Sequence, residues 1–292
     1  MIDTKLKNKI ALITGANNPM GIGAAIAKAL SKEGVKIFLQ YFRSFKSNDS
    51  AKISDEEYGE AFYLYQQTKN CDEVLSSIKE IGGEAYAIEF DLSNPENIPN
   101  LFDEVEKIFG KIDIVINNAA YWEADTFIPS DEKLKNELVE LWTSKPNTIN
   151  SESIDKIFAV NTKAPVLIIK EYVKRFLRNK LNWGRIINIS TAGAYIFPSE
   201  ISYGASKFAL ESYTRSAAIE LGKYNITVNA LSLGPVQTGW INKELEKQIL
   251  LSIPLGKIGS PEDVADAVVF FSSNQARWIT GQRIYIGGGH GM

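Results

Sequence analysis

The sequence predicts an α/β fold in which one doubly wound parallel sheet is covered by helices on both faces, forming a single three-layer α/β/α domain. Short runs rich in Val and Ile alternate with helical patterns along all 292 residues, which is typical of βα units. The runs are continuously apolar, as expected of strands that are buried on both faces. No linker, repeat or low-complexity segment divides the chain, so residues 1–292 are expected to form one domain.

The expected elements follow one another in strict alternation. Strands are expected over 9–14, 35–41, 85–91, 112–117, 185–190, 227–233 and 283–286. Helices are expected over 21–33, 73–81, 98–109, 154–179, 202–222 and 261–272. Two connections, 44–70 and 122–153, are longer than this pattern needs, and their aromatic residues are expected to pack locally or at a subunit contact.

Composition excludes several classes of function. The net charge is -3, with no basic cluster, so neither nucleic acid nor a membrane surface is an expected partner. No apolar run approaches the roughly 20 residues of a membrane span, and the polar N-terminus does not resemble a signal peptide. The single cysteine, Cys71, fits a reducing cytoplasm. With one histidine, His290, neither a His/Cys zinc site nor a Ser-His-Asp triad is expected, so no metal site is predicted.

Tyr203 and Lys207 form the most informative pair of residues. They stand four apart in a helical pattern, which places a phenol and an ammonium group on one helix face. A nearby cation favours the phenolate and lowers the pKa of a tyrosine. The pair therefore suits a general acid/base that interconverts an alcohol and a carbonyl. Taken alone, the spacing also fits an ordinary exposed helix face.

A glycine-rich turn, Thr14 to Gly23, follows the first expected strand and opens a helix. It contains Gly15, Gly21, Ile22 and Gly23. Glycine allows positive φ and lets backbone N–H groups approach a pyrophosphate, and the helix N-terminus then faces the negative charge. This placement predicts dinucleotide binding on a Rossmann-type sheet.

The end of the second expected strand bears on which dinucleotide binds. An acid there would accept hydrogen bonds from the adenosine ribose and favour NAD. The segment from Gln40 to Ser44 contains no acid, and Arg43 is placed to pair with a 2′-phosphate. The sequence thus favours NADP over NAD, with a solvated surface arginine as the alternative.

Taken in order, these segments resemble the short-chain dehydrogenase/reductase family, in its compact single-domain branch, over nearly the whole chain. The segments that carry the resemblance are Thr14–Gly23, Asp91-Leu92, Asn117-Asn118-Ala119-Ala120, Asn161, Ser190, Tyr203 with Lys207, Asn229 with Gly234–Thr238, Pro261–Ala265 and Trp278–Gln282. The subgroup looks like the 3-oxoacyl-carrier-protein reductase relatives.

The resemblance implies a role for each catalytic position. Tyr203 would donate a proton to a carbonyl oxygen, or remove one from an alcohol, and Lys207 would lower its pKa and hold the nicotinamide ribose. Ser190 would hydrogen-bond the substrate oxygen, and Asn161 would hold a water behind Lys207. The cofactor contacts implied are Thr14, Gly15, Gly21, Ile22, Gly23, Arg43, Asp91, Leu92, Asn117, Ala119, Tyr203, Lys207, Gly234, Val236 and Thr238.

The chain departs from the family pattern at the glycine turn and at the serine. Five residues separate Gly15 from Gly21 where three are usual, and the extra residues are expected to bulge over the pyrophosphate. Ala120 and Leu233 are milder departures, standing where Gly and Pro are usual.

The hydroxyl that polarises the substrate has two candidates. Counting back from Tyr203 selects Ser190, which we favour, whereas counting forward from the strand selects Thr191.

The family resemblance also implies an activity and an assembly. The expected activity is hydride transfer between NAD(P) and a carbonyl/secondary alcohol pair, most simply NADPH-dependent ketone reduction. An NAD-dependent alcohol dehydrogenase and a non-catalytic nucleotide sensor are the alternatives. Segments 192–201 and 239–254 are expected to bound an apolar substrate pocket, to which 122–153 adds a wall. A homotetramer, or a homodimer, is expected to form through helices 154–179 and 202–222.

Overall fold

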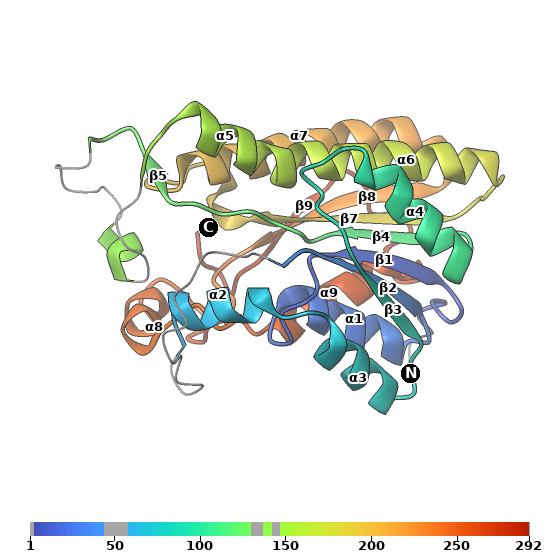
Figure 1. Cartoon of the computed structure of the whole chain (residues 1–292), viewed down its shortest axis with the longest axis horizontal. Helices are drawn as coiled ribbons and strands as arrows, with labels where there is room; N and C mark the ends of the chain where they lie inside the picture. Colours follow the sequence, from blue (N-terminus) through green and yellow to red (C-terminus); the bar gives the residue numbers. More distant parts are fainter. Residues whose placement is uncertain (1–2, 44–57, 130–136, 142–146, 292) are drawn as a thin grey trace.

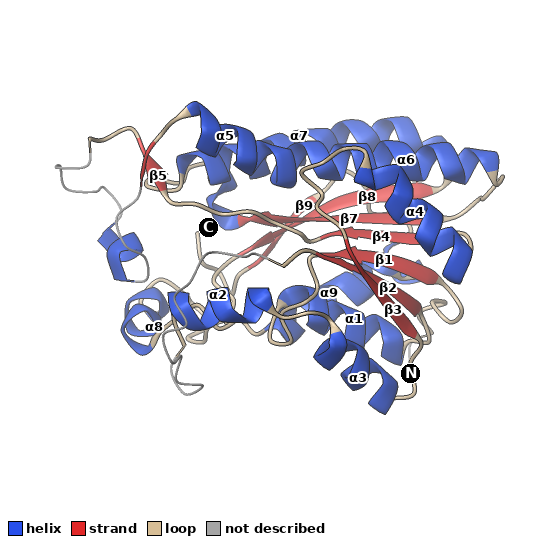
Figure 2. Ribbon diagram, in the orientation of Figure 1, coloured by secondary structure: helices blue, strands red, loops and turns tan. Residues whose placement is uncertain are grey.

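A seven-stranded parallel sheet forms the centre of the computed structural model (Figures 1 and 2), which describes residues 3–43, 58–129, 137–141 and 147–291. The strand order is β3-β2-β1-β4-β7-β8-β9, and every neighbouring pair is parallel. The strands are β1 (Ile10–Thr14), β2 (Lys36–Tyr41), β3 (Ala85–Glu89), β4 (Ile114–Asn117), β7 (Gly184–Thr191), β8 (Ile226–Leu233) and β9 (Arg283–Ile286). The predicted doubly wound sheet is confirmed.

Helices cover both faces of this sheet. Those below it in Figure 1 are α1 (Ile22–Lys32), α3 (Asp72–Glu80) and α9 (Pro261–Ser272), and those above it are α4 (Asn97–Ile108), α6 (Ala164–Arg178) and α7 (Ile201–Leu221). Successive strand residues supply the two cores alternately: Ala11 and Ile13 pack against α1 and α9, whereas Leu12 packs on the opposite face. Both faces of each central strand are therefore buried, which explains the continuously apolar runs.

The strand order reverses between β1 and β4. From β1 the chain winds outward through β2 to β3, and β4 then returns to the other side of β1. Ligands of doubly wound sheets bind in the crevice beyond the carboxyl ends of the strands at such a reversal. The topology therefore places the glycine turn after β1 and the loop after β4 side by side at this crevice.

The long helix expected over 154–179 is locally distorted in the structure. It consists of α5 (Ser151–Phe158), a π-helical turn over Ala159–Lys163, and α6. Pro165 has no N–H and cannot donate the α-helical bond to the carbonyl of Asn161, which accounts for the local change of register. Turns of this kind often mark functional positions, and Asn161 lies inside this one.

Several elements were not expected from the sequence. These are α2 (Glu60–Thr68), α8 (Lys243–Leu250), the two-residue strands β5 (Asp125–Thr126) and β6 (Asn147–Thr148), and the 3₁₀ turns Glu137–Leu141, Ala192–Ala194, Gly222–Tyr224 and Asn274–Ala276. The first long connection thus contains α2, and the second contains the β5–β6 pair. Parts of both connections, 44–57, 130–136 and 142–146, lie outside the described residues.

Within the described part of the chain, no helix is both long enough and apolar enough to cross a membrane.

Candidate active site

The glycine turn is closed by a contact that only glycine permits. Gly15 has φ +69°, and a Cβ on it would lie 2.6 Å from the Cα of Ala119 in the loop after β4. A Cβ on Gly23 would lie 2.6 Å from the carbonyl oxygen of Gly15. The turn therefore needs glycine at two positions, once for the backbone angle and once for close packing.

The start of α1 suits an anion. Gly21 caps this helix and offers no side-chain hydrogen bond to its first turn, so the first N–H groups point outward with the positive end of the helix dipole. A hollow of about 220 Å³ adjoins the turn, with Met20, Gly21 and Gln237 among its lining residues. The turn fits the pyrophosphate of a dinucleotide.

Two asparagines of the longer turn, Asn17 and Asn18, are buried. The Asn17 Nδ2 donates to the carbonyl oxygens of Gln67 (3.0 Å) and Lys69 (2.8 Å) at the end of α2. The Asn18 Nδ2 donates to the carbonyl oxygen of Thr238 at 3.0 Å. The longer turn therefore fastens the insertion helix and the loop after β8 to the cofactor crevice.

Thr14 and its neighbours across the crevice hold the two loops together. The Thr14 hydroxyl accepts from the backbone N–H groups of Asn118 and Ala119, both at 3.0 Å. The Asn118 side chain, which sequence reasoning left without a role, donates to the carbonyls of Thr14 and Gly15. Asn117 instead bonds Asn188 inside the sheet at 2.8 Å. Thr14 and Asn117 thus support the crevice from within, and Ala119 lies at its wall.

Arg43 stands at the end of β2, as expected, but beside an acid from the neighbouring strand. Its Nε and Nη2 donate to the Glu89 carboxylate at 2.7–3.0 Å. This ion pair lowers the pKa of Glu89 and raises that of Arg43. No signal within β2 could reveal Glu89, because parallel pairing with β3 brings it there.

The remaining residues predicted to contact the cofactor differ in burial. Leu92 is buried in the core between the sheet and α4, and the Asp91 carboxylate accepts from the backbone N–H of Ser93 at 2.8 Å. Gly234 packs so closely against Gly287 that a Cβ would lie 2.7 Å from its Cα. Val236 and Thr238 are also mostly buried. Leu92, Val236 and Thr238 therefore pack inside the protein, whereas Asp91 is half-buried.

Tyr203 and Lys207 lie in the first two turns of α7, at the carboxyl end of β7. Lys207 is buried, and its ammonium group donates to the carbonyl oxygen of Ile189 at 3.0 Å. Its Nζ lies 5.8 Å from the centre of the Tyr203 ring. The ring of Phe197 packs on the other side, at 6.2 Å between centroids. The predicted phenol and ammonium pair is therefore present.

The pKa of Tyr203 shifts opposite to the expected direction. Burial raises it, and the charges of Glu200 and Tyr63 raise it further. Burial also lowers the pKa of Lys207 to about 8, since no acid compensates its charge among the groups that shift it. Lys207 therefore does not dominate the electrostatics of Tyr203, because desolvation outweighs the attraction of a cation at this distance.

Asn161 connects the long helix to the crevice. Its amide oxygen accepts from the Tyr121 backbone N–H and its Nδ2 donates to the Tyr121 carbonyl, both at 2.8 Å. The Nδ2 also contacts the Ser206 hydroxyl at 3.1 Å. Asn161 thus links the loop after β4 to α7. Its contact on α7 is Ser206, the residue that precedes Lys207 in the sequence.

The Ser190 hydroxyl has a buried partner. It donates to the Glu211 carboxylate of α7 at 2.6 Å. Thr191 is half-buried at the strand end. Its Oγ1 accepts from the Gly193 N–H at 3.3 Å, and no described group accepts its proton. The uncommitted proton therefore favours Thr191, the alternative that was counted forward from the strand.

Three further groups at the crevice had no individual role in the sequence analysis, because distant segments bring them there. Glu200 precedes Tyr203 by three residues, Trp122 comes from the loop after β4, and Tyr63 comes from α2. The aromatic cluster of the first insertion was the only sequence signal for Tyr63.

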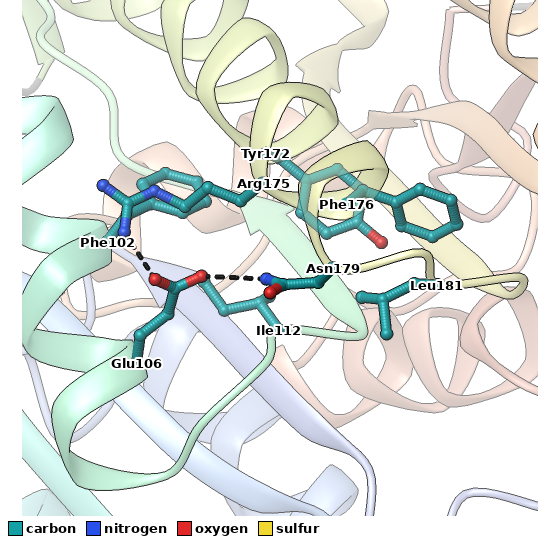
Figure 3. A pocket seen from close by; sticks show the side chains of 8 residues that line it. All are labelled: Phe102, Glu106, Ile112, Tyr172, Arg175, Phe176, Asn179 and Leu181. Carbon is teal, nitrogen blue, oxygen red and sulfur yellow. Dashed lines mark hydrogen bonds and ion pairs between the residues drawn. The ribbon is translucent and has the colours of Figure 1, made fainter.

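A second hollow lies away from the crevice, between α4 and α6 (Figure 3). It leaves only about 10 Å³ around the Arg175–Glu106 ion pair and is too small for a substrate.

Comparison with known proteins agrees with this arrangement. A family model described as enoyl-(acyl carrier protein) reductase matches residues 50–290. The uncharacterized oxidoreductase YjdA of Bacillus subtilis is 33% identical over 97% of both chains. The 3-oxoacyl-[acyl-carrier-protein] reductase FabG of Rickettsia felis is 34% identical over 99% of this chain and 98% of its own. A mutant short-chain dehydrogenase/reductase from Serratia marcescens superposes with a TM-score of 0.75 at 27% identity, covering 98% and 99% of the two chains. The chain belongs to the short-chain dehydrogenase/reductase family of oxidoreductases.

Proposed function

We propose that the protein is an NADPH-dependent reductase of ketones that also runs the reverse oxidation of secondary alcohols. The observation that carries this proposal is the placement of Tyr203 and Lys207 across the crevice from the glycine turn. A proton donor and a dinucleotide site then face one another at the reversal of the strand order.

In the proposed reaction, Tyr203 donates its proton to the carbonyl oxygen. A raised pKa keeps this phenol protonated at neutral pH, which suits an acid in reduction. Lys207 lies behind it and Asn161 holds the loop after β4 against α7, so both are placed to pass a replacement proton through water. The bound nicotinamide supplies or accepts the hydride.

We assign the polarising hydroxyl to Thr191. A donor aimed at the carbonyl oxygen stabilises the negative charge that develops there. Thr191 has its proton free among the described residues, whereas the Ser190 proton is committed to Glu211. Ser190 is then a support for α7.

NADPH is the proposed cofactor because an arginine just after β2, Arg43, suits the charge of a 2′-phosphate. Glu89 orients the guanidinium but also compensates its charge, so the preference is expected to be modest. The test is a titration of the purified protein with NADPH and NADH side by side. Tighter binding of NADPH, lost in Arg43→Ala, supports the proposal, and tighter binding of NADH contradicts it.

The proposed substrate is a medium-sized, apolar ketone. Tyr195 and Ile196, in the loop after β7, are 76% and 72% exposed, and exposed apolar side chains near a crevice suit an apolar ligand. The Rickettsia relative is named for a 3-oxoacyl substrate. A panel of ketones graded by chain length tests this, with kcat/KM expected to rise with length. A preference for small charged carbonyls would contradict it.

We further propose a homotetramer, or a homodimer, that buries the outer face of α7. Phe208, Tyr213 and Ile219 are exposed along this helix, Ile219 by 85%. Exposed apolar patches of this kind mark protein contacts. Light scattering that gave a monomer would overturn the proposal.

We also propose a cytoplasmic location, with which the buried free thiol of Cys71 is compatible.

A further inference from the structure

Two buried carboxyl groups lie together at the start of α7. Asp125 is fully buried and Glu200 is 8% exposed. They come from segments 75 residues apart, yet their backbones pair as in a parallel sheet, with the Asp125 N–H donating to the carbonyl oxygen of Ser199 at 3.1 Å. The insertion that contains β5 thus brings one acid against another.

The hydrogen bonds around this pair are incomplete. The Trp122 Nε1 donates to Glu200 Oε2 at 2.5 Å, and the Ser202 N–H donates to Asp125 Oδ1 at 2.9 Å. Asp125 Oδ2 and the hydroxyls of Ser199 and Ser202 are buried without a partner among the described residues. An unpaired buried carboxylate oxygen is costly. The negative charge of Asp125 also opposes ionisation of Glu200.

The pair also lies beside Tyr203. Glu200 stands one helical turn before it, and the Glu200 carbonyl accepts from the Gly204 N–H at 2.9 Å. Burial raises the pKa of Glu200 to about 7, the Trp122 hydrogen bond opposes this rise, and the negative charge of Asp125 adds to it. The charged and titratable groups that act on this cluster are Asp125 on β5, Tyr203 on α7 and Tyr63 on α2. A change of charge at Glu200 is therefore felt by the phenol of Tyr203.

We propose that Glu200 is a positioning residue whose buried carboxyl group, bonded to Trp122, gains and loses a proton, so that its charge controls how firmly Tyr203 holds its own proton. This inference rests on the proposed function. When Glu200 is protonated it adds no charge beside the phenol. When it is ionised, its negative charge stabilises the protonated phenol, which maintains reduction and moves alcohol oxidation to more alkaline pH.

The first test needs no turnover. The indole N–H of Trp122 reports on its acceptor, so its NMR signal is followed from pH 5 to 9 in the full-length protein. We expect a transition with a midpoint near the Glu200 value of about 7, which disappears in Glu200→Gln. Trp240, whose Nε1 donates to the Val236 carbonyl, is the internal control. Its indole N–H signal should show no such transition. A flat Trp122 signal overturns the proposal.

A second variant covers the case in which Glu200→Gln folds poorly. Asp125→Asn keeps an oxygen that can accept from Ser202 but removes the charge that raises the pKa of Glu200. The midpoint of the Trp122 transition should then move to lower pH. An unchanged midpoint overturns the inferred effect of Asp125 on Glu200.

The third test uses the pH profile of alcohol oxidation and of ketone reduction. In Glu200→Gln the rise of oxidation with pH should occur roughly one pH unit lower, since one nearby charge is gone. Glu220→Gln removes a charge from an exposed position on the same helix and should leave the profile unchanged. Ordinary turnover with an unmoved profile in Glu200→Gln overturns this inference alone. Absence of turnover with every carbonyl tested overturns the proposed function together with it.

Discussion

The two walls of the crevice are built from different kinds of interaction. The wall around the glycine turn is held by neutral hydrogen bonds from Thr14 and Asn118 and by contacts that exclude any Cβ. The wall around α7 contains buried ionisable groups, among them Lys207, Glu200 and Glu211. Neutral bonds hold their geometry at any pH, whereas buried charges are costly and respond to pH. The comparison indicates that binding and proton transfer can be varied independently.

The largest expected effect separates the two walls directly. Tyr203→Phe removes the proton donor from the α7 wall and leaves the glycine turn intact. We expect turnover to fall roughly a thousand-fold, within the range for loss of a general acid, while NADPH affinity measured by titration changes little. Equal losses of turnover and affinity would contradict the separation.

The two hydroxyls at the end of β7 provide a sharper test of the α7 wall. Thr191→Val should lower kcat about a hundred-fold, as for loss of one donor to a developing oxyanion, with thermal stability nearly unchanged. Ser190→Ala should do the reverse, because Glu211 loses its donor and the free energy of unfolding should fall by about 1–3 kcal/mol. The measurements are kcat and the melting temperature of both variants. A large loss of kcat in Ser190→Ala, with little change in Thr191→Val, would identify Ser190 as the polarising group.

Substitutions of two glycines test the other wall. Gly15→Ala places a Cβ 2.6 Å from Ala119 and should weaken NADPH binding at least tenfold, since the turn must open. Gly82→Ala is the matched control: its φ is +79°, yet nothing lies within 4 Å of the new Cβ. It should cost only about 1–2 kcal/mol of stability from backbone strain and leave affinity intact. Equal affinity losses would show that the close contact is unimportant.

The smallest expected effect concerns the ion pair at the edge of the cofactor wall. Glu89→Gln keeps a hydrogen-bond acceptor for Arg43 but removes the compensating charge. NADPH affinity should rise several-fold, by roughly 1 kcal/mol as expected for one exposed charge pair, and NADH affinity should stay constant. A rise for both cofactors would mean that Glu89 acts on the adenosine rather than on the phosphate.

Sequence periodicity was sufficient for the sheet and the helices that cover it, because both depend on local apolar patterns. The helix Glu60–Thr68 escaped prediction because its pattern is weak and its stability comes from distant partners such as Asn17. The choice between Ser190 and Thr191 stays a prediction. Residue counting along a shortened loop favours Ser190, whereas the hydrogen bond from Ser190 to Glu211 favours Thr191.

Two acids, one beside each wall, show a second limit. Glu89 and Asp125 reach their partners through strand pairing across the fold, so no local spacing announces them. The direction of the Tyr203 pKa was missed for the same reason. A sequence shows that Lys207 is near, but only the packed structure shows how far water is excluded.

The side chain of Asn17 has a consequence for motion. It supplies hydrogen bonds to the last carbonyls of α2 from within the turn that is proposed to grip the pyrophosphate, while the N–H of Gly59 at the other end of the helix bonds the carbonyl of Gly239 at 2.9 Å. Fraying of α2 should therefore be coupled to opening of the turn. A dinucleotide that steadies the turn should slow amide hydrogen exchange throughout the insertion helix, including residues that never touch it.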